Sequence, residues 1–202
     1  GMFGRMERVE VDGVDVTDET VGTTTQNIPA SAIQEFQLAQ SFLDLSTGLA
    51  SAGAVNVITR SGSDQLHGEA FGVFRGDQGG ASPPGTPMTS FQREGYGANA
   101  GGAIIKDKVF WFADAERSMQ NLTAAEPFTP PFDGLNIALV EPYREFDTDE
   151  RVDWNMRGST RAFYRFSFFQ NNDLRPFGSA SSTQEFRNDN NTLTNALGAD
   201  FN

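Results

Sequence analysis

From Ser63 onward the sequence consists of long segments in which apolar and polar residues alternate. Alternation of this kind places the two sorts of side chain on opposite faces of an extended backbone, so each segment predicts a β-strand. The predicted strands lie at 66–75, 95–105, 108–118, 149–157, 161–171 and 192–201. This part of the chain is therefore predicted to be a β structure with strands of about ten residues.

The connections between these strands alternate in length. Residues 106–108 and 157–160 are tight charged or polar turns, whereas 76–94, 119–148 and 172–191 are long and rich in Pro, Gly, Ser and Asn. Short turns on one side and long loops on the other are typical of an outer-membrane β-barrel, in which the turns face the periplasm. A soluble β-sandwich also has many strands, so the pattern alone leaves both architectures open.

The segment 161–171 has two chemically different faces. One face is apolar and mostly aromatic, and the other carries polar side chains beside two phenylalanines. This division suits a strand with lipid outside and water inside. The first face holds Ala162, Tyr164, Phe166 and Phe168, and the second holds Phe163, Arg165, Ser167, Phe169 and Asn171.

The segment 108–118 divides less cleanly. Phe110 and Phe112 share a face with Asp114 and Glu116. An inward aromatic pair predicts packing against something inside a barrel, whereas a soluble sheet covered on both sides would give the same pattern. Lys106 to Lys108 should form the turn of an antiparallel hairpin between this segment and 95–105.

Residues 7 to 60 carry shorter and more varied signals. Alternating valines flank Asp12-Gly13, and Asp-Gly between alternating apolar residues predicts a tight hairpin turn. Residues 53–59 form a compact apolar segment that predicts a strand, and we expect it to share a small sheet with residues 7 to 16. The alternating valines are Val9, Val11, Val14 and Val16.

A short helix is predicted to begin near Pro29. Ser31 would be its N-cap residue, and Gln34 would complete a capping box. The helix must be short, because Phe36 and Leu38 then alternate with polar residues, as in a strand.

Composition excludes several classes of function. The net charge of −12 and the pI near 4.4 argue against nucleic-acid binding, which needs an excess of Lys and Arg, and against peripheral docking on anionic lipid. They do not exclude insertion as a β-barrel, in which charge lies in the loops and the lumen. There is no cysteine and a single histidine, His67, so thiolate chemistry and multi-histidine metal sites are excluded. The sequence contains no run of 18 apolar residues, so it predicts no transmembrane helix.

Candidate catalytic and metal-binding groups are few. The acidic run Asp147, Asp149, Glu150 and Asp153 could bind Ca²⁺ through carboxylate oxygens, but a solvated loop is the favoured interpretation because the EF-hand spacing is missing. The run 188–191 receives the same interpretation, and His67 is interpreted as a structural polar group. We therefore predict no catalytic, cofactor-binding or metal-binding residue, and a chain that is not an enzyme.

Five blocks of sequence, in order, resemble one family. They are Ile28–Gln37, Gly53–Gly62, His67–Arg75, Gly101–Phe112, and Arg151–Asp153 followed by Tyr164–Ser167. In this order they resemble the TonB-dependent outer-membrane transporters, especially the Oar-like group. Gly53–Gly62 resembles the terminal strand of the plug and is the most specific block. The sequence departs from the family pattern between Gln40 and Gly53, which affects the expected contacts of the plug loops.

The resemblance implies a mainly β fold. Residues 2–62 would be the C-terminal part of the plug domain, a small mixed sheet with a short helix. Residues 63–202 would be the first antiparallel strands and loops of a transmembrane β-barrel that is incomplete here, since the family barrel has about 22 strands. We also expect the isolated chain to self-associate, because about six strands leave two unpaired edges.

The resemblance also implies a function. Such a transporter takes up a scarce solute, such as a siderophore, an oligosaccharide or a peptide, and is energised by TonB through a segment absent from this chain. Its other contact would be outer-membrane lipid, and no nucleic acid or cofactor is expected. The alternative is a secreted all-β module that binds carbohydrate or another ligand through Trp111 or Trp154.

Overall fold

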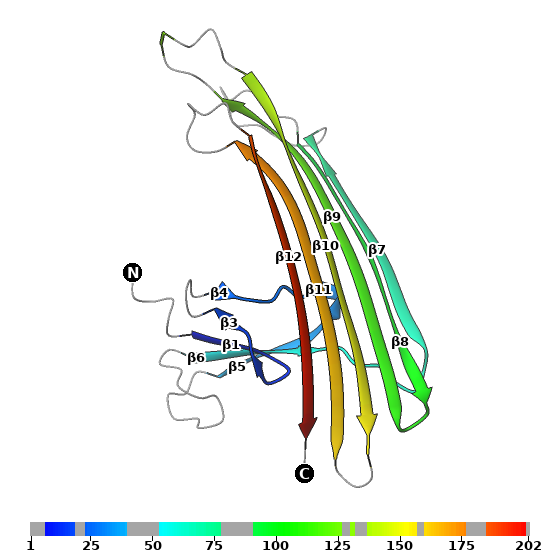
Figure 1. The fold of residues 1–202 in the computed structure, drawn as a ribbon. Coiled ribbons are helices and arrows are strands. Elements are labelled where there is room, and N and C mark those ends of the chain that lie inside the picture. The colour runs from blue at the N-terminus through cyan, green and yellow to red at the C-terminus, as the bar shows by residue number, and fades with distance from the viewer. Residues whose placement is uncertain are drawn as a thin grey trace.

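The computed structural model describes residues 7–18, 23–39, 53–77, 91–126, 130–131, 137–156, 160–176 and 185–200. These residues form two principal sheets, and Figure 1 shows the larger as a tall curved wall with the smaller lying on its concave side. The small sheet is nearer to the hairpin turns at the lower end of the wall. No helix in the described part of the chain is long and apolar enough to cross a membrane.

In the described residues the large sheet has six strands, each paired antiparallel with its neighbour in sequence, in the order β12-β11-β10-β9-β8-β7. The predicted hairpin is confirmed: β8 and β9 pair through a turn at 106–108, where Asp107 has a φ of 63°. The strands are β7 (His67–Gly76), β8 (Phe91–Ile105), β9 (Val109–Glu126), β10 (Ile137–Asn155), β11 (Arg161–Pro176) and β12 (Glu185–Asp200).

The strands are longer than the sequence predicted. The stretches 119–126 and 137–148, predicted to be parts of a loop, belong to β9 and β10 and pair continuously. The loop prediction was therefore wrong for these stretches. Polar residues alternate there on a sheet whose concave face is itself polar, so the hydrophobic alternation that identifies a strand is weak. The prediction was also wrong for 91–94, 172–176 and 185–191, which belong to β8, β11 and β12. Residues 78–90, 127–129, 132–136 and 177–184 of the predicted loops lie outside the described residues.

The small sheet has the order β2-β1-β6-β5. Its central pair, β1 and β6, is parallel, with Val9 opposite Val55, while the outer strands are antiparallel. This confirms the predicted pairing of residues 53–59 with the 7–16 region. The strands are β1 (Glu7–Val11), β2 (Val14–Asp15), β5 (Ile33–Ala39) and β6 (Gly53–Thr59), beside a separate pair, β3 (Thr17–Asp18) and β4 (Thr23–Thr24).

The predicted helix is only a three-residue 3-10 turn, η1 (Ala30–Ala32). The prediction of Ser31 as N-cap with a capping box was wrong, because Pro29 is the N-cap residue and no side-chain cap is formed. Ile33 is already extended, and β5 continues from it along β6. Pairing with β6 and the contacts of Ser31 with the large sheet, described below, override the local helical preference.

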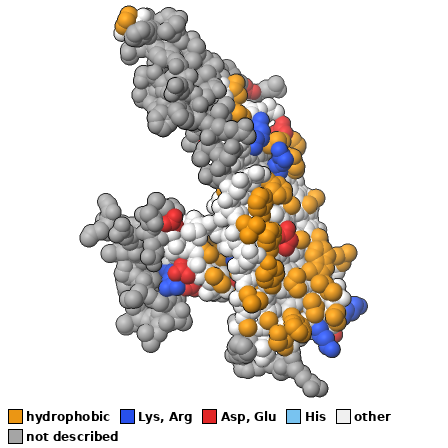
Figure 2. All heavy atoms as spheres, in the orientation of Figure 1, with side chains coloured by type: hydrophobic (Ala, Val, Ile, Leu, Met, Phe, Trp, Pro, Cys, Tyr) orange, Lys and Arg blue, Asp and Glu red, His pale blue; other side chains and the backbone are white. Residues whose placement is uncertain are grey.

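The two faces of the large sheet differ as the segment 161–171 predicted. On the concave side Phe112, Phe163 and Phe169 are buried, as are Arg165 and Ser167. The convex side exposes large apolar residues: Trp154, Tyr164, Leu193 and Leu197. Figure 2 shows hydrophobic side chains gathered over the large sheet, with Lys and Arg side chains above and below them. Phe112 is buried on the concave side, as expected for an inward-facing aromatic residue of the segment 108–118.

The core of the small sheet is modest. Val11, Val16 and Val57 are buried, and partly buried apolar neighbours pack around them: Val9, Ile28, Ile33 and Val55. A cluster of this size leaves the contacts with the large sheet an important role in holding the small sheet in place.

Candidate functional site

The site begins at Asp12, at the tip of the turn between β1 and β2. Asp12 and Gly13 have φ angles of 50° and 76°, and positive φ at both central residues makes this a type I′ turn, which suits Asp-Gly. The Thr59 N–H donates to Asp12 Oδ1 at 2.9 Å, and the Thr59 hydroxyl donates to Oδ2 at 2.8 Å. The turn therefore fixes a carboxylate, with its side chain only 4% exposed, at the edge of the small sheet.

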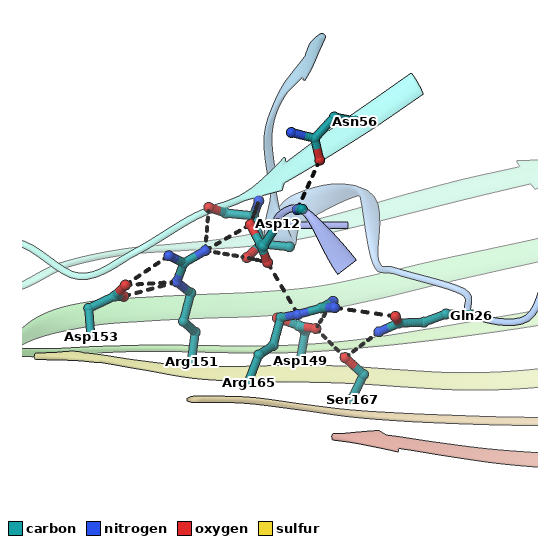
Figure 3. Close-up of polar contacts among 10 residues, drawn as sticks. Asp12, Gln26, Asn56, Asp149, Arg151, Asp153, Arg165 and Ser167 are labelled. Atoms are coloured by element: carbon teal, nitrogen blue, oxygen red, sulfur yellow. Dashed lines mark hydrogen bonds and ion pairs between the residues drawn. The ribbon is translucent and has the colours of Figure 1, made fainter. Parts of the chain in front are cut away.

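Two arginines of the large sheet reach this carboxylate, as Figure 3 shows. Arg151 on β10 places Nη1 2.9 Å from Asp12 Oδ1, and Arg165 on β11 places Nε 3.2 Å from Oδ2. The arginines are Cα partners across β10 and β11, a position in which like charges repel. The Asp12 carboxylate between them offsets that repulsion, so the small sheet adds a shared counter-charge to those that each arginine finds on the wall itself.

Arg151 is oriented by three further groups. Its guanidinium forms a two-pronged ion pair with Asp153, with Nη2 2.8 Å from Oδ1, and donates from Nη1 to Thr59 Oγ1 at 2.9 Å. Its Cζ atom lies 4.6 Å from the centroid of the Phe163 ring, a cation–π distance. These contacts hold the side chain toward the small sheet.

Arg165 is buried more deeply, at 1% exposure. Its Nη1 lies 3.5 Å from Asp149 Oδ2, and its Nη2 donates to Gln26 Oε1 at 3.3 Å. Gln26 in turn donates from Nε2 to Ser167 Oγ at 2.8 Å, and Ser167 donates to Asp149. Gln26 precedes η1, so a second segment of the small-sheet region enters the same network (Figure 3).

A third polar contact is made by Ser31 in η1. Its N–H donates to Glu116 Oε1 at 2.9 Å, and its hydroxyl donates to Asp114. Both carboxylates belong to the inner face of β9, and Asp114 is 3% exposed. Three separate points of the 12–59 region thus contact the concave wall: Asp12 with Thr59, Gln26, and Ser31.

The character of this interface has energetic consequences. Removing one partner from a buried ion pair costs about 3–5 kcal/mol, because the other charge stays buried without compensation. Replacing a whole buried network by apolar residues of similar volume can be neutral, so the cost of removing one partner is larger than the net stabilisation that the network provides. Charged groups also regain water when they separate, whereas apolar faces do not, so a polar interface can open at lower cost than a hydrophobic one of equal area.

The acidic run singled out in the sequence lies within β10, and its interpretation as a solvated loop was wrong. Asp147, Asp149 and Asp153 point to the concave side, the first two buried, while Glu150 lies on the convex face. Alternation along a strand separates neighbours in the sequence onto two faces. Within the described residues no group of three or more His, Asp or Glu side chains could hold a metal ion.

The remaining candidates do not join the site. His67 is exposed at the start of β7, and its Nδ1 lies 3.0 Å from the Gln65 carbonyl oxygen. Trp111 and Trp154 are on the convex face. The run 188–191 belongs to β12, so its interpretation as a solvated loop was wrong, and the side chains of 188–190 lie outside those described. Asp12 and Arg151 were missed as contact residues. Available signals were the position of Asp12 in an Asp-Gly turn and the lone cations on the acidic inner face of β10 and β11.

Comparison with known proteins shows which proteins this chain is similar to. The family model of the outer membrane beta barrel domain matches residues 58–136. The TonB-dependent transporter Oar of Myxococcus xanthus is 30% identical over 163 residues, which cover 76% of this chain. This chain is a relative of the TonB-dependent outer-membrane transporters. It spans 15% of the length of the Myxococcus relative.

Solved structures support the same fold. The siderophore receptor PirA of Acinetobacter baumannii matches 85% of this chain and 24% of its own, with a TM-score of 0.56 and 17% identity. A mutant of the ferric enterobactin receptor PfeA of Pseudomonas aeruginosa matches 95% of this chain and 30% of its own, with a TM-score of 0.53 and 14% identity. At these identities the likeness concerns the fold alone.

The matches to the outer membrane beta barrel domain and to the Oar transporter place this chain in the bacterial outer membrane. The names of the matched proteins are those of transporters and receptors, not of enzymes. The alternative of a secreted carbohydrate-binding module loses its motivation, since Trp111 and Trp154 lie on the convex face of a membrane-barrel wall, among its apolar side chains. The absence of catalysis stays a prediction.

Proposed function

We propose that this chain forms part of an outer-membrane transporter that takes up a scarce solute and is energised through TonB. Residues 2–62 are the C-terminal part of its plug domain, and residues 63–202 are the first strands and loops of its barrel. The plug sheet lies inside the barrel and closes the lumen. The solute is of the kind such transporters carry: a siderophore, an oligosaccharide or a peptide.

The observation that carries this proposal is the buried ion-pair cluster of Asp12, Arg151 and Arg165, which joins the small sheet to the large one. A plug must be held firmly enough to prevent leakage and must yield when it is pulled. Charged contacts that regain water on separation meet both requirements better than an apolar seam. Irregular backbone at membrane depth is also tolerated when it lies within a barrel rather than against lipid.

The experiment uses the source bacterium. The gene is deleted, and growth is compared on media in which iron, a ferric siderophore, an oligosaccharide or a peptide is limiting. The full-length protein should restore growth on at least one of these solutes, and only while TonB and the proton gradient of the inner membrane are intact. Uptake that continues without TonB, driven by the concentration gradient alone, would contradict active transport.

A second arm separates the plug from the rest of the proposal. Full-length protein in a planar lipid bilayer should conduct little, and a variant without the plug domain should form a large open channel. Equal conductance of the two proteins would show that the small sheet does not close the lumen.

A further inference from the structure

A hollow lies on the convex face of β9 to β12. Its volume is about 500 Å³. It opens to the outside of the wall, on the opposite face from the ion-pair cluster of Asp12, Arg151 and Arg165. It is lined by Arg117, Arg144, Glu145, Phe146, Gln170, Asn172 and Asn191. We call Arg117, Arg144, Phe146, Gln170 and Asn191 together the outer arginine patch.

The patch begins where the apolar surface ends. Phe146 is the Cα partner of Arg117 and packs on Phe168, with ring centroids 6.4 Å apart. Below it on the same face of β11 are Phe166 and Tyr164, and Figure 2 shows Lys and Arg side chains next to the hydrophobic area. The patch therefore lies at one border of the apolar area.

Strand geometry gives the height of that border. From Val109, beside the short turn, to Arg117 is a rise of about 3.3 Å per residue, or about 20 Å after a tilt near 40°. The apolar band of a membrane barrel is about 25 Å tall. Arg117 is thus at the end of the band remote from the short turns, which is the outer leaflet when those turns face the periplasm.

Glu145, the one carboxylate in the lining of the hollow, accepts a hydrogen bond from the Tyr143 hydroxyl and forms no ion pair with the arginines of the patch. Arg144 donates only to neutral acceptors: the carbonyl oxygens of Gln120 at 2.9 Å and Tyr143 at 2.8 Å, and Asn121 Oδ1 at 2.8 Å. Arg117 is exposed, and no carboxylate among the described residues pairs with either guanidinium. Because the two arginines are diagonal neighbours on β9 and β10, one anion can contact both.

We propose that the outer arginine patch binds the phosphate of a phosphorylated lipid headgroup in the outer leaflet. Guanidinium groups bind phosphate through two parallel hydrogen bonds, and the amides of Gln170 and Asn191 add neutral donors. The acyl chains of the same lipid lie on Phe146 and Phe168. This continuity with the apolar band favours a lipid over a free anion, because a soluble ion gains nothing from the aromatic surface.

The site requires only that the wall lies in the membrane, so it stands independently of the transported solute. Full-length protein, stripped of lipid in detergent, is mixed with phosphorylated lipid A, with dephosphorylated lipid A or with inorganic phosphate, and bound lipid is counted by native mass spectrometry. The test variant is R117Q with R144Q. The matched control is R75Q with R93Q, which removes two charges from the concave face, where Arg75 and Arg93 are Cα partners.

We expect phosphorylated lipid A to bind the native protein and the control. The R117Q/R144Q variant should bind it about tenfold more weakly, because hydrogen bonds between charged groups and the phosphate are lost. A variant with Lys at both positions, which keeps the charge, should retain most of the binding. Equal binding of phosphorylated and dephosphorylated lipid would overturn the proposal. So would an equal loss in the control, or competition by inorganic phosphate at the lipid's own concentration, which would indicate a site for soluble anions.

Discussion

Arg151 and Arg165 face each other across neighbouring strands, yet both guanidinium groups are directed at one carboxylate, that of Asp12. Two like charges side by side on a barrel wall are unfavourable unless a third group lies between them. The wall provides one carboxylate for each arginine, Asp153 for Arg151 and Asp149 for Arg165. The docked small sheet adds the one carboxylate that lies between the two. The predictions below follow from this arrangement.

Replacing Asp12 by Asn should loosen the small sheet in the full-length protein. The change removes the carboxylate that both guanidinium groups share and leaves each with its wall carboxylate alone. The loss should therefore approach the lower end of the range of about 3–5 kcal/mol for a broken buried ion pair. Amide hydrogen exchange of β1 and β6 should become faster, while exchange of β9 to β11 should change little. Unchanged exchange in β1 and β6 would mean that the ion pairs do not hold the sheet.

Asp15 provides the matched control for Asp12. It pairs with Arg8 at 2.9 Å within the small sheet, and its side chain is 39% exposed. Burial alone would raise the pKa of Asp15, but the hydrogen bonds from Thr17 and the charge of Arg8 outweigh it, and the net pKa is lowered. The Asp15 carboxyl group therefore stays ionised at neutral pH. Because exposed ion pairs contribute only about 0–1 kcal/mol, D15N should leave the exchange of the docked sheet nearly unchanged.

A double-mutant cycle should reveal coupling between the sheets. D12A and R165M, made singly and together in the full-length protein, should give a coupling free energy of about 1–3 kcal/mol, as expected for groups in direct contact. The pair should be less damaging together than the sum of the single changes, because the double variant leaves neither charge buried alone. Strict additivity would place the two residues in separate networks.

Gly198 should tolerate no side chain. A Cβ atom there would lie 2.2 Å from Cε1 of the Phe163 ring, and that ring supports Arg151 at 4.6 Å. G198A should therefore displace the ring and loosen the small sheet, with a loss of about 1–3 kcal/mol for overpacking. Gly95 is the control, since a Cβ atom there would meet only Ser118 Oγ, at 3.8 Å. Equal effects of G198A and G95A on the exchange of β1 would exclude this packing role.

The isolated 202-residue chain should self-associate in buffer without detergent. Its described strands leave β7 and β12 as sheet edges, and large apolar side chains such as Tyr164 and Leu197 are exposed. The net charge of −12 opposes aggregation but supplies no partner for the edges. Light scattering coupled to size exclusion measures the outcome, and a monomer at all concentrations would contradict it.

Much of this architecture could be predicted from residues alone. The Asp-Gly turn, the 53–59 strand and the hairpin at 106–108 all follow from local chemistry, which is why they were found. The upper halves of β9 and β10 were missed because an inner face that carries Glu145 and Asp147 shows no apolar alternation. Ser31 was misassigned because its hydrogen-bond partners, Asp114 and Glu116, are more than eighty residues away along the chain.

The ion pairs of Asp12 with Arg151 and Arg165 could not be predicted from the sequence either, because the partners are far apart along the chain. Asp12 and Arg151 are 139 positions apart, and no local sequence pattern links them. The sequence showed that Arg165 faces inward but not that a turn of another sheet meets it.

The most direct test of the central claim is to tie the small sheet to the wall and measure conductance. The chain has no cysteine of its own, so Ser31→Cys with Asp114→Cys, residues that share a hydrogen bond, introduces one defined pair in the full-length protein. In a planar bilayer with urea, the reduced protein should open as the small sheet leaves the wall. The oxidised protein and the native protein without urea should stay closed. Equal opening of the oxidised and reduced proteins, or an open channel before urea is added, would contradict a lumen closed by the small sheet.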